Sequence, residues 1–262
     1  MDASAPSEPY YRPISNEVEV FKLAWEQRLA LLLKGPTGCG KSRFVEAMAR
    51  KLERPLISVA CHDETTSADL LGRWLVQGGD TVWQDGPVTR ALRQGAILYL
   101  DEVAEAREDV IVVLHPLTDH RRELLLDRHD EVLHAPVSFM LVASFNPGYQ
   151  RGLKEMKPST RQRFVTLAFD YPPPKIEAEI VATEGGIERK LAERFVGFAT
   201  KVRKMTEVGL SETVSTRLLV SAAKLTVAGL PPRRALSIAA VEALSDDREV
   251  VAALNDVVSL MV

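Results

Sequence analysis

Cysteine is scarce in this chain of 262 residues, which contains two, Cys39 and Cys61. Two cysteines cannot form a disulfide framework, so the fold depends on a packed core and suits a reducing compartment. Long hydrophobic runs are missing too, because runs such as Leu29–Leu33 fall far below the roughly 20 residues that a membrane-spanning helix needs. The first residues also lack the charged and apolar regions of a signal peptide. We therefore expect a cytoplasmic protein without membrane insertion.

An excess of positive charge is also missing. The chain carries 33 Lys and Arg against 36 Asp and Glu, which gives a net charge of −3. Non-specific binding to nucleic acid depends on a basic face that neutralises phosphates, so nucleic acid is not an expected partner. By contrast, 46% of the residues are hydrophobic, which is enough for a substantial core.

Short apolar runs recur along the first part of the chain and predict strands buried on both faces, as in a parallel sheet covered by helices. The runs are Leu29–Leu33, Leu56–Ala60, Ile97–Leu100, Phe139–Ala143 and Phe164–Phe169. Between them, Ser67–Trp74 and Val110–Leu117 are predicted to be helices, and Trp74 and Trp83 are interpreted as packing residues. This pattern is typical of an α/β fold.

Tyr171–Pro174 is the clearest break in the chain, since its three prolines can continue neither a helix nor a sheet ladder. After it the hydrophobic spacing becomes helical, in residues 175–184, 188–204, 213–228, 232–244 and 247–259. We predict an α/β domain over residues 1–170 and a small all-helical domain over residues 171–262.

Residues 35–42 read GPTGCGKS, which matches the phosphate-binding loop pattern G-x-x-x-x-G-K-[ST]. Its glycines let the backbone approach a phosphate closely, so that N–H groups and the positive end of the following helix face the anion. Lys41 would reach the β and γ phosphates, and Ser42 would offer its hydroxyl to Mg²⁺. The predicted nucleotide-binding residues of this P-loop are Gly35, Pro36, Thr37, Gly38, Cys39, Gly40, Lys41 and Ser42.

The apolar run Ile97–Leu100 ends in two carboxylates, Asp101 and Glu102. The carboxyl ends of parallel strands form the edge at which open α/β sheets bind ligands. Asp101 would hold Mg²⁺, usually through its water shell, and Glu102 would orient and polarise the attacking water. A strand that ends in two acids is a weak signal alone, but together with the P-loop it predicts hydrolysis of ATP with Mg²⁺ as cofactor.

A third strand, Phe139–Ser144, is followed by Phe145-Asn146-Pro147 and resembles the sensor 1 region of AAA+ ATPases. The resemblance implies that Asn146 holds the attacking water or contacts the γ-phosphate. On local grounds the same asparagine could simply begin an Asn-Pro turn. The sequence around it therefore supports a catalytic interpretation only in combination with the P-loop.

Two further arginine positions resemble functional positions of AAA+ ATPases. The segment Lys157–Phe164 resembles the one that carries the arginine finger, which enters the site of a neighbouring subunit. Arg163 is the favoured finger and Arg161 a helper or salt-bridge residue, although the assignment could be reversed and both could be surface arginines. Arg217 resembles the sensor 2 arginine of the lid, or is a first-turn residue of a capped helix.

Taken together, these motifs resemble the CbbQ/NorQ group in the MoxR branch of AAA+ ATPases, and are most like CbbQ. The segments that carry the resemblance are Tyr10–Pro13, the P-loop, Ala60–Asp63, Trp83–Pro87, Ile97–Glu102, Asn146–Gln150 and Pro158–Phe164. The resemblance implies a homo-hexameric ring, a helical lid, and a β-hairpin before sensor 1, for which Arg121–Pro136 is the candidate. It also implies a larger partner with a von Willebrand factor A domain, and a client protein. For CbbQ that client is Rubisco, freed from inhibitory sugar phosphates, and for NorQ it is nitric oxide reductase during maturation.

Two other classes of P-loop protein remain open. A nucleotide switch or metabolic kinase would need neither a ring nor a lid arginine. A DNA helicase or clamp-loader-like AAA+ protein would share the motifs, but the weakly acidic charge of the chain speaks against it.

Overall fold

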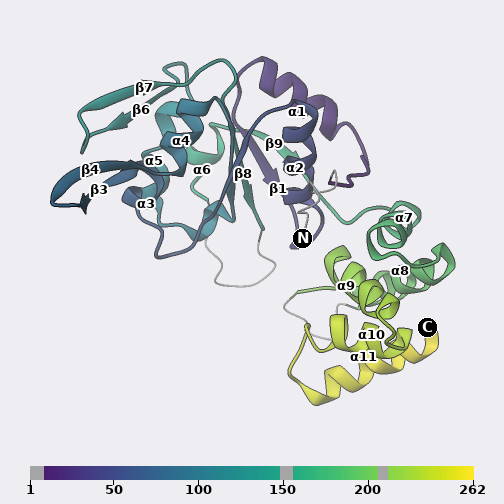
Figure 1. Cartoon of the computed structure of the whole chain (residues 1–262). Helices are drawn as coiled ribbons and strands as arrows, with labels where there is room; N and C mark the ends of the chain where they lie inside the picture. Colours follow the sequence, from purple (N-terminus) through teal and green to yellow (C-terminus); the bar gives the residue numbers. More distant parts are fainter. Residues whose placement is uncertain (1–8, 148–155, 206–211) are drawn as a thin grey trace, which may run out of the picture.

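The computed structural model describes residues 9–147, 156–205 and 212–262. Its centre is a parallel sheet of five strands in the order β2-β5-β8-β1-β9, and Figure 1 shows this sheet above a separate group of helices. The strands are β1 (Leu31–Lys34), β2 (Leu56–Ala60), β5 (Ile97–Asp101), β8 (Met140–Phe145) and β9 (Val165–Ala168). Each strand overlaps one of the predicted apolar runs, so the α/β fold with a parallel sheet is confirmed.

Helices cover both faces of the sheet. The helical segments of this domain are α1 (Glu17–Glu26), α2 (Lys41–Lys51), α3 (Ser67–Leu71), α4 (Pro87–Gln94), η1 (Val103–Glu105), α5 (Glu108–Val112), η2 (His115–Leu117) and α6 (Pro158–Arg161). Leu31 and Leu33 of β1 pack in one core with α1 and α2, whereas Leu32 packs in the other with α4 and α5. Because successive strand side chains alternate between faces, a continuous apolar run supplies both cores.

Two helices are shorter than predicted. Helix α3 ends at Leu71, and the chain turns at Gly72, whose φ is 135°, so that Trp74 lies in a strand and not in a helix. The helix predicted over Val110–Leu117 ends at Val112, and the chain continues into the 3₁₀ segment η2. Pro116 in that segment lacks the backbone N–H that a helix interior requires.

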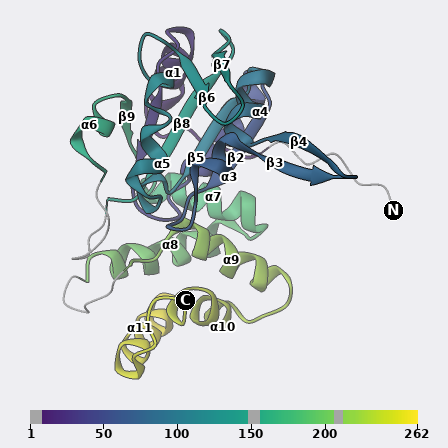
Figure 2. The ribbon, with the colours of Figure 1, turned by 90° about the vertical axis from the view of Figure 1, so that its left-hand side faces the viewer.

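Two antiparallel hairpins extend from the α/β domain: β3 (Gly72–Gln77) with β4 (Asp80–Asp85), and β6 (Glu123–Leu126) with β7 (Glu131–His134). Figure 2 shows the first projecting away from the sheet. The second confirms the predicted hairpin, whereas the first is not among the predicted elements. The ring of Trp83 stacks on His129 with centroids 4.8 Å apart, and Trp74 Nε1 donates a hydrogen bond of 2.8 Å to the Arg128 carbonyl. The two hairpins therefore pack against each other.

The chain after the linker is helical, as predicted, and its helices share one core. They are α7 (Pro174–Gly185), α8 (Arg189–Arg203), α9 (Thr216–Val227), α10 (Pro232–Leu236), the π-helical η4 (Ser237–Val241) and α11 (Arg248–Met261). Ser215 caps α9, because its side chain accepts a hydrogen bond from the backbone N–H of Leu218. Strand β9 ends at Ala168 and α7 begins at Pro174, so we propose a domain boundary between residues 170 and 171. None of the helices that the structure describes is long and apolar enough to cross a bilayer.

A buried charged cluster ties the helical domain to the P-loop. Glu177 in the first turn of α7 is fully buried, and Arg203 Nη1 and Nη2 each donate a hydrogen bond of 2.7 Å to its carboxylate. Thr216 Oγ1 donates another bond of 2.7 Å to Glu177 Oε1. The Arg203 guanidinium lies 3.9 Å from the ring centroid of Tyr171, and the Tyr171 hydroxyl donates to the carbonyl of Thr37 at 3.1 Å. The cluster thus connects α7, α8 and α9 to the P-loop.

Candidate nucleotide-binding site

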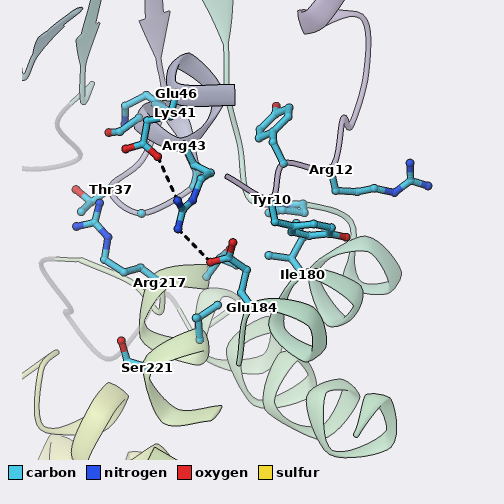
Figure 3. A pocket seen from close by; sticks show the side chains of 18 of the residues that line it. Tyr10, Arg12, Thr37, Lys41, Arg43, Glu46, Ile180, Glu184, Arg217 and Ser221 are labelled. Atoms are coloured by element: carbon cyan, nitrogen blue, oxygen red, sulfur yellow. Dashed lines mark hydrogen bonds and ion pairs between the residues drawn. The ribbon is translucent and has the colours of Figure 1, made fainter. Parts of the chain in front are cut away.

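A cavity of about 570 Å³ lies between the P-loop and the helical domain. Figure 3 shows its walls, which come from the P-loop and α2, from the N-terminal segment that includes Tyr10 and Arg12, and from α7 and α9. Asp101 and Glu102 line it from the edge of the sheet. The volume is typical of small-molecule sites, and the cavity brings predicted residues of both domains together.

The P-loop has the backbone conformation that its glycines predict. Gly38 and Gly40 have φ values of 68° and 106°, a region that residues with a side chain rarely adopt. A Cβ atom on Gly38 would also lie 2.6 Å from Cβ of Ser215, so glycine lets the loop approach the lid closely. Gly40 is the N-cap of α2, an 11-residue helix that begins at Lys41. The positive end of this helix therefore faces the cavity, as phosphate binding requires.

Lys41, Asn146 and Glu102 form one hydrogen-bonded network at the end of the P-loop. Lys41 Nζ donates a bond of 2.6 Å to Asn146 Oδ1, and two more to the carbonyls of Gly35 and Pro36 at 2.8 and 3.0 Å. Asn146 Nδ2 donates to Glu102 Oε1 at 2.7 Å. A single amide thus joins the phosphate-binding cation to the carboxylate that would polarise water.

Glu102 sits in a strained position that places its side chain at the network. Its φ and ψ are 54° and 45°, in the left-handed region that a residue with a side chain seldom occupies. Burial raises the pKa of its carboxyl, and the charge of Lys41 opposes that shift. Strain of this kind and a raised carboxyl pKa are both common at catalytic sites.

Ser42 and Asp101 present oxygen ligands of the type that Mg²⁺ prefers. Ser42 Oγ donates a hydrogen bond of 3.2 Å to Asp101 Oδ2, so the two predicted ligands lie side by side at the start of α2 and the end of β5. Mg²⁺ usually keeps several waters and takes one or two protein ligands beside the phosphates. A hydroxyl and a carboxylate that both line the cavity fit that requirement.

The lid and the N-terminal segment supply the rest of the cavity wall. Arg217 lines the cavity from the start of α9, as the resemblance to sensor 2 predicts. Arg43 lies across the cavity between the domains, with ion pairs of 3.2 Å to Glu46 on α2 and to Glu184 on α7 (Figure 3). Tyr10 also lines it and donates a hydrogen bond of 3.1 Å to Glu179. The cavity is thus bounded by charged and aromatic groups beyond the predicted set.

Arg161 and Arg163 are not brought to this cavity. Neither is among the described residues that line it. Arg161 is exposed, whereas Arg163 is partly buried, with Nη1 3.3 Å from Asp119 Oδ2. Its Nε is buried and has no hydrogen-bond partner among the described residues. Of the Asn146–Gln150 segment, residues 148–150 lie outside the described part of the chain.

Several residues of the site were not predicted from the sequence. Tyr99 and Ser144 contact Asp101 through hydrogen bonds of 2.8 and 2.6 Å, and Arg43 and Tyr171 contact the lid and the P-loop. A signal was present for the first two, because each is a polar group in an otherwise apolar strand that ends at the ligand-binding edge. Nothing in the local sequence identifies Arg43 or Tyr171.

We expect Asn146→Ala to lower ATP hydrolysis by about 10²-fold, a loss typical of removing one fixed donor from a catalytic site. The substitution removes the amide between Lys41 and Glu102, whereas the P-loop backbone stays intact, so nucleotide affinity should change little. Phosphate release and binding of a fluorescent nucleotide would measure the two effects. Asn255→Ala on α11 is the matched control, and unchanged hydrolysis in Asn146→Ala would refute the assigned role.

Two family models match the chain. Residues 30–164 match the AAA domain (dynein-related subfamily), and residues 177–261 match the CbbQ/NirQ/NorQ C-terminal model. A crystal structure of a protein from Cytophaga hutchinsonii has the same fold, with a TM-score of 0.53 at 16% identity over 95% of this chain and 90% of that one. The two models together cover both the α/β and the helical parts of the chain.

Relatives are similar over nearly their whole length. The chain is 56% identical to the denitrification regulatory protein NirQ of Pseudomonas aeruginosa, covering 97% of this chain and 98% of the relative. It is 57% identical to protein NorQ of Paracoccus denitrificans, over 95% and 92%, and 52% identical to protein CbbQ of Hydrogenophilus thermoluteolus, over 95% and 93%. These matches agree with the P-loop, the parallel sheet and the helical lid, and the chain belongs to the CbbQ/NirQ/NorQ family of AAA+ ATPases.

Proposed function

We propose that the protein hydrolyses ATP at interfaces between its own copies and uses the energy to remodel a client protein complex. The observation that carries this proposal is the network in which Asn146 joins Lys41 to Glu102 at the edge of the cavity. In this scheme Lys41 neutralises phosphate charge, Glu102 positions the attacking water, and Ser42 and Asp101 hold Mg²⁺. Arg217 contacts the nucleotide from the lid.

The ring is supported by the position of the segment that resembles the arginine-finger segment. The described lining contains no residue of the segment Lys157–Phe164, and a cation at the transferred phosphate is what P-loop ATPases supply in cis or in trans. We assign this role to Arg163 of a neighbouring copy, with Arg161 as its helper. A homo-hexamer is the assembly that we propose.

The client is one of two complexes, each reached together with a partner that carries a von Willebrand factor A domain. Rubisco is the client that the sequence resemblance to CbbQ favours. Nitric oxide reductase is the second candidate, and the chain has similar identity to proteins named NirQ, NorQ and CbbQ, at 56%, 57% and 52%, so both clients stay in the proposal. The experiment must therefore be able to recover either one.

The test is affinity capture from native extract with Glu102→Gln in the presence of ATP. This variant keeps the phosphate-binding loop but loses the group that polarises water, so hydrolysis should fall by about 10²-fold or more while ATP stays bound. Retained ATP should hold the client complex long enough to identify it by mass spectrometry. The same capture with Lys41→Ala, which lacks the phosphate-binding cation, gives the background.

The proteins recovered in this experiment distinguish the two candidate clients. Rubisco with a von Willebrand A protein supports the activase role, and nitric oxide reductase subunits support the maturation role. If both variants recover the same proteins in the same amounts, ATP-dependent remodelling of a client is contradicted.

A further inference from the structure

The hydroxyl of Tyr99 contacts both Ser42 and Asp101, the two residues that would hold Mg²⁺. Tyr99 is on β5, two residues before Asp101, and is 2% exposed. Its hydroxyl donates a hydrogen bond of 2.8 Å to Asp101 Oδ1 and lies 3.2 Å from Ser42 Oγ and 3.1 Å from Ser144 Oγ. One buried hydroxyl thus reaches the P-loop and strands β5 and β8.

Hydrogen bonds from two buried hydroxyl groups fix the orientation of the Asp101 carboxylate. Ser144, which is fully buried, donates a second hydrogen bond to Asp101 Oδ1, at 2.6 Å. Tyr99 and Ser144 therefore both donate to the same carboxylate oxygen. The other oxygen, Oδ2, is 3.2 Å from Ser42 Oγ and is the one left facing the P-loop. Hydrogen bonds from two buried donors are strong and directional because the acceptor is charged.

We propose that Tyr99 and Ser144 are positioning residues that fix the Asp101 carboxylate, so that Oδ2 and the hydroxyl of Ser42 meet Mg²⁺ in one arrangement. This inference rests on the proposed ATPase function and adds two residues to it that touch neither nucleotide nor metal. Without the two donors, the Asp101 side chain would have to be ordered when the metal binds. The free-energy cost of that ordering lowers the affinity for Mg²⁺, whereas the contacts of the P-loop backbone with phosphate stay the same.

Ser144 has a second contact that Tyr99 lacks. Its Oγ accepts a hydrogen bond of 3.2 Å from the backbone N–H of Glu102, the residue held at a φ of 54°. Ser144 therefore supports both the carboxylate toward Mg²⁺ and the strained residue that would polarise water. Loss of the Ser144 hydroxyl should weaken Mg²⁺ binding and also lower the rate of hydrolysis. Loss of the Tyr99 hydroxyl should mainly weaken Mg²⁺ binding.

The test is the binding of a fluorescent ADP analogue to the full chain, titrated first in EDTA and then at increasing Mg²⁺. In Tyr99→Phe we expect the Mg²⁺ concentration for half-maximal enhancement of binding to rise by about tenfold, the effect of losing one hydrogen bond to a charged group. The affinity measured in EDTA should stay within about twofold, because a metal-free nucleotide does not use the Asp101 carboxylate. Ser144→Ala should shift the Mg²⁺ dependence in the same direction.

Tyr171→Phe is the matched control, since it removes another tyrosine hydroxyl at the P-loop that bonds the Thr37 carbonyl and not Asp101. Any loss of affinity in this control should be equal with and without Mg²⁺. Thermal melting of each variant verifies that it is folded. Equal Mg²⁺ dependence in Tyr99→Phe and the unaltered protein would overturn the proposal. Binding that Mg²⁺ does not enhance in the unaltered protein would also overturn the proposal, because Asp101 and Ser42 would then not hold the metal. If the unaltered protein does not bind the ADP analogue in EDTA or in Mg²⁺, the proposed nucleotide site itself fails, which is a separate result.

Discussion

Arg163→Ala is expected to reduce ATP hydrolysis by about 10³-fold or more and to leave ATP binding intact, because an arginine finger acts on the charge of the transition state. We propose that this effect crosses between copies, and the position of Arg163 is the reason. Arg163 lies outside the described lining of its own cavity and is oriented by its ion pair of 3.3 Å with Asp119. Phosphate release at several protein concentrations and nucleotide binding would measure the two effects.

A mixing experiment tests whether the arginine acts in trans. Subunits with Arg163→Ala keep their own Glu102, and subunits with Glu102→Gln keep their own Arg163. At an interface where the second kind faces the site of the first, one complete site forms, so the mixture should regain activity that neither variant has alone. Arg161→Ala is the paired control and should lose less activity than Arg163→Ala. The reverse order would assign the finger to Arg161, and full activity in Arg163→Ala would exclude it as the finger.

Arg203→Met should destabilise the helical domain by about 3–5 kcal/mol, the usual cost of removing one partner from a buried ion pair. Glu177 would stay fully buried with its carboxylate facing an apolar side chain. The substitution also removes the bond of 2.8 Å from Arg203 Nε to the Val214 carbonyl and the contact with Tyr171. Denaturant unfolding followed by circular dichroism would measure the change in the transition midpoint.

The double variant Glu177→Leu with Arg203→Met separates the charge from the packing. It removes both charges, and apolar residues of similar volume often replace a buried pair with little loss, so it should be more stable than Arg203→Met alone. Arg189→Met serves as the surface control, because its ion pair with Glu193 joins two exposed side chains and contributes little. A double variant no more stable than the single one would refute the charge explanation.

The parts of the site that the sequence predicts are those with local rules. The P-loop needs glycines at set positions followed by a helix, and a strand buried on both faces must be apolar until it reaches the ligand edge, where Asp101 and Glu102 stand. Asn146 at the end of the neighbouring strand is indicated by the resemblance to sensor 1, since on local grounds it could also begin an Asn-Pro turn. Each of these patterns lies within a few residues, so the chain reveals them without its tertiary structure.

The parts that escaped prediction depend on contacts between distant segments. The helix expected to include Trp74 gives way to a hairpin whose tryptophans pack on His129, a residue of another hairpin. Arg43 faces the cavity because Glu184 of the lid lies opposite, and Tyr171 in the proline-rich linker reaches the P-loop because Arg203 supports its ring. No short-range pattern encodes such pairings.

The contact between the two hairpins contains two tryptophans, so the intrinsic fluorescence of the protein is sensitive to hairpin packing. The ring of Trp83 is stacked on His129 with centroids 4.8 Å apart, and the ring of Trp74 lies 5.5 Å from that of Trp83. Separation of the hairpins would change the surroundings of both indole rings and therefore their emission, whereas Trp25 on α1 would contribute a constant background. Movement of these hairpins during a catalytic cycle could be followed in the unlabelled protein, in real time.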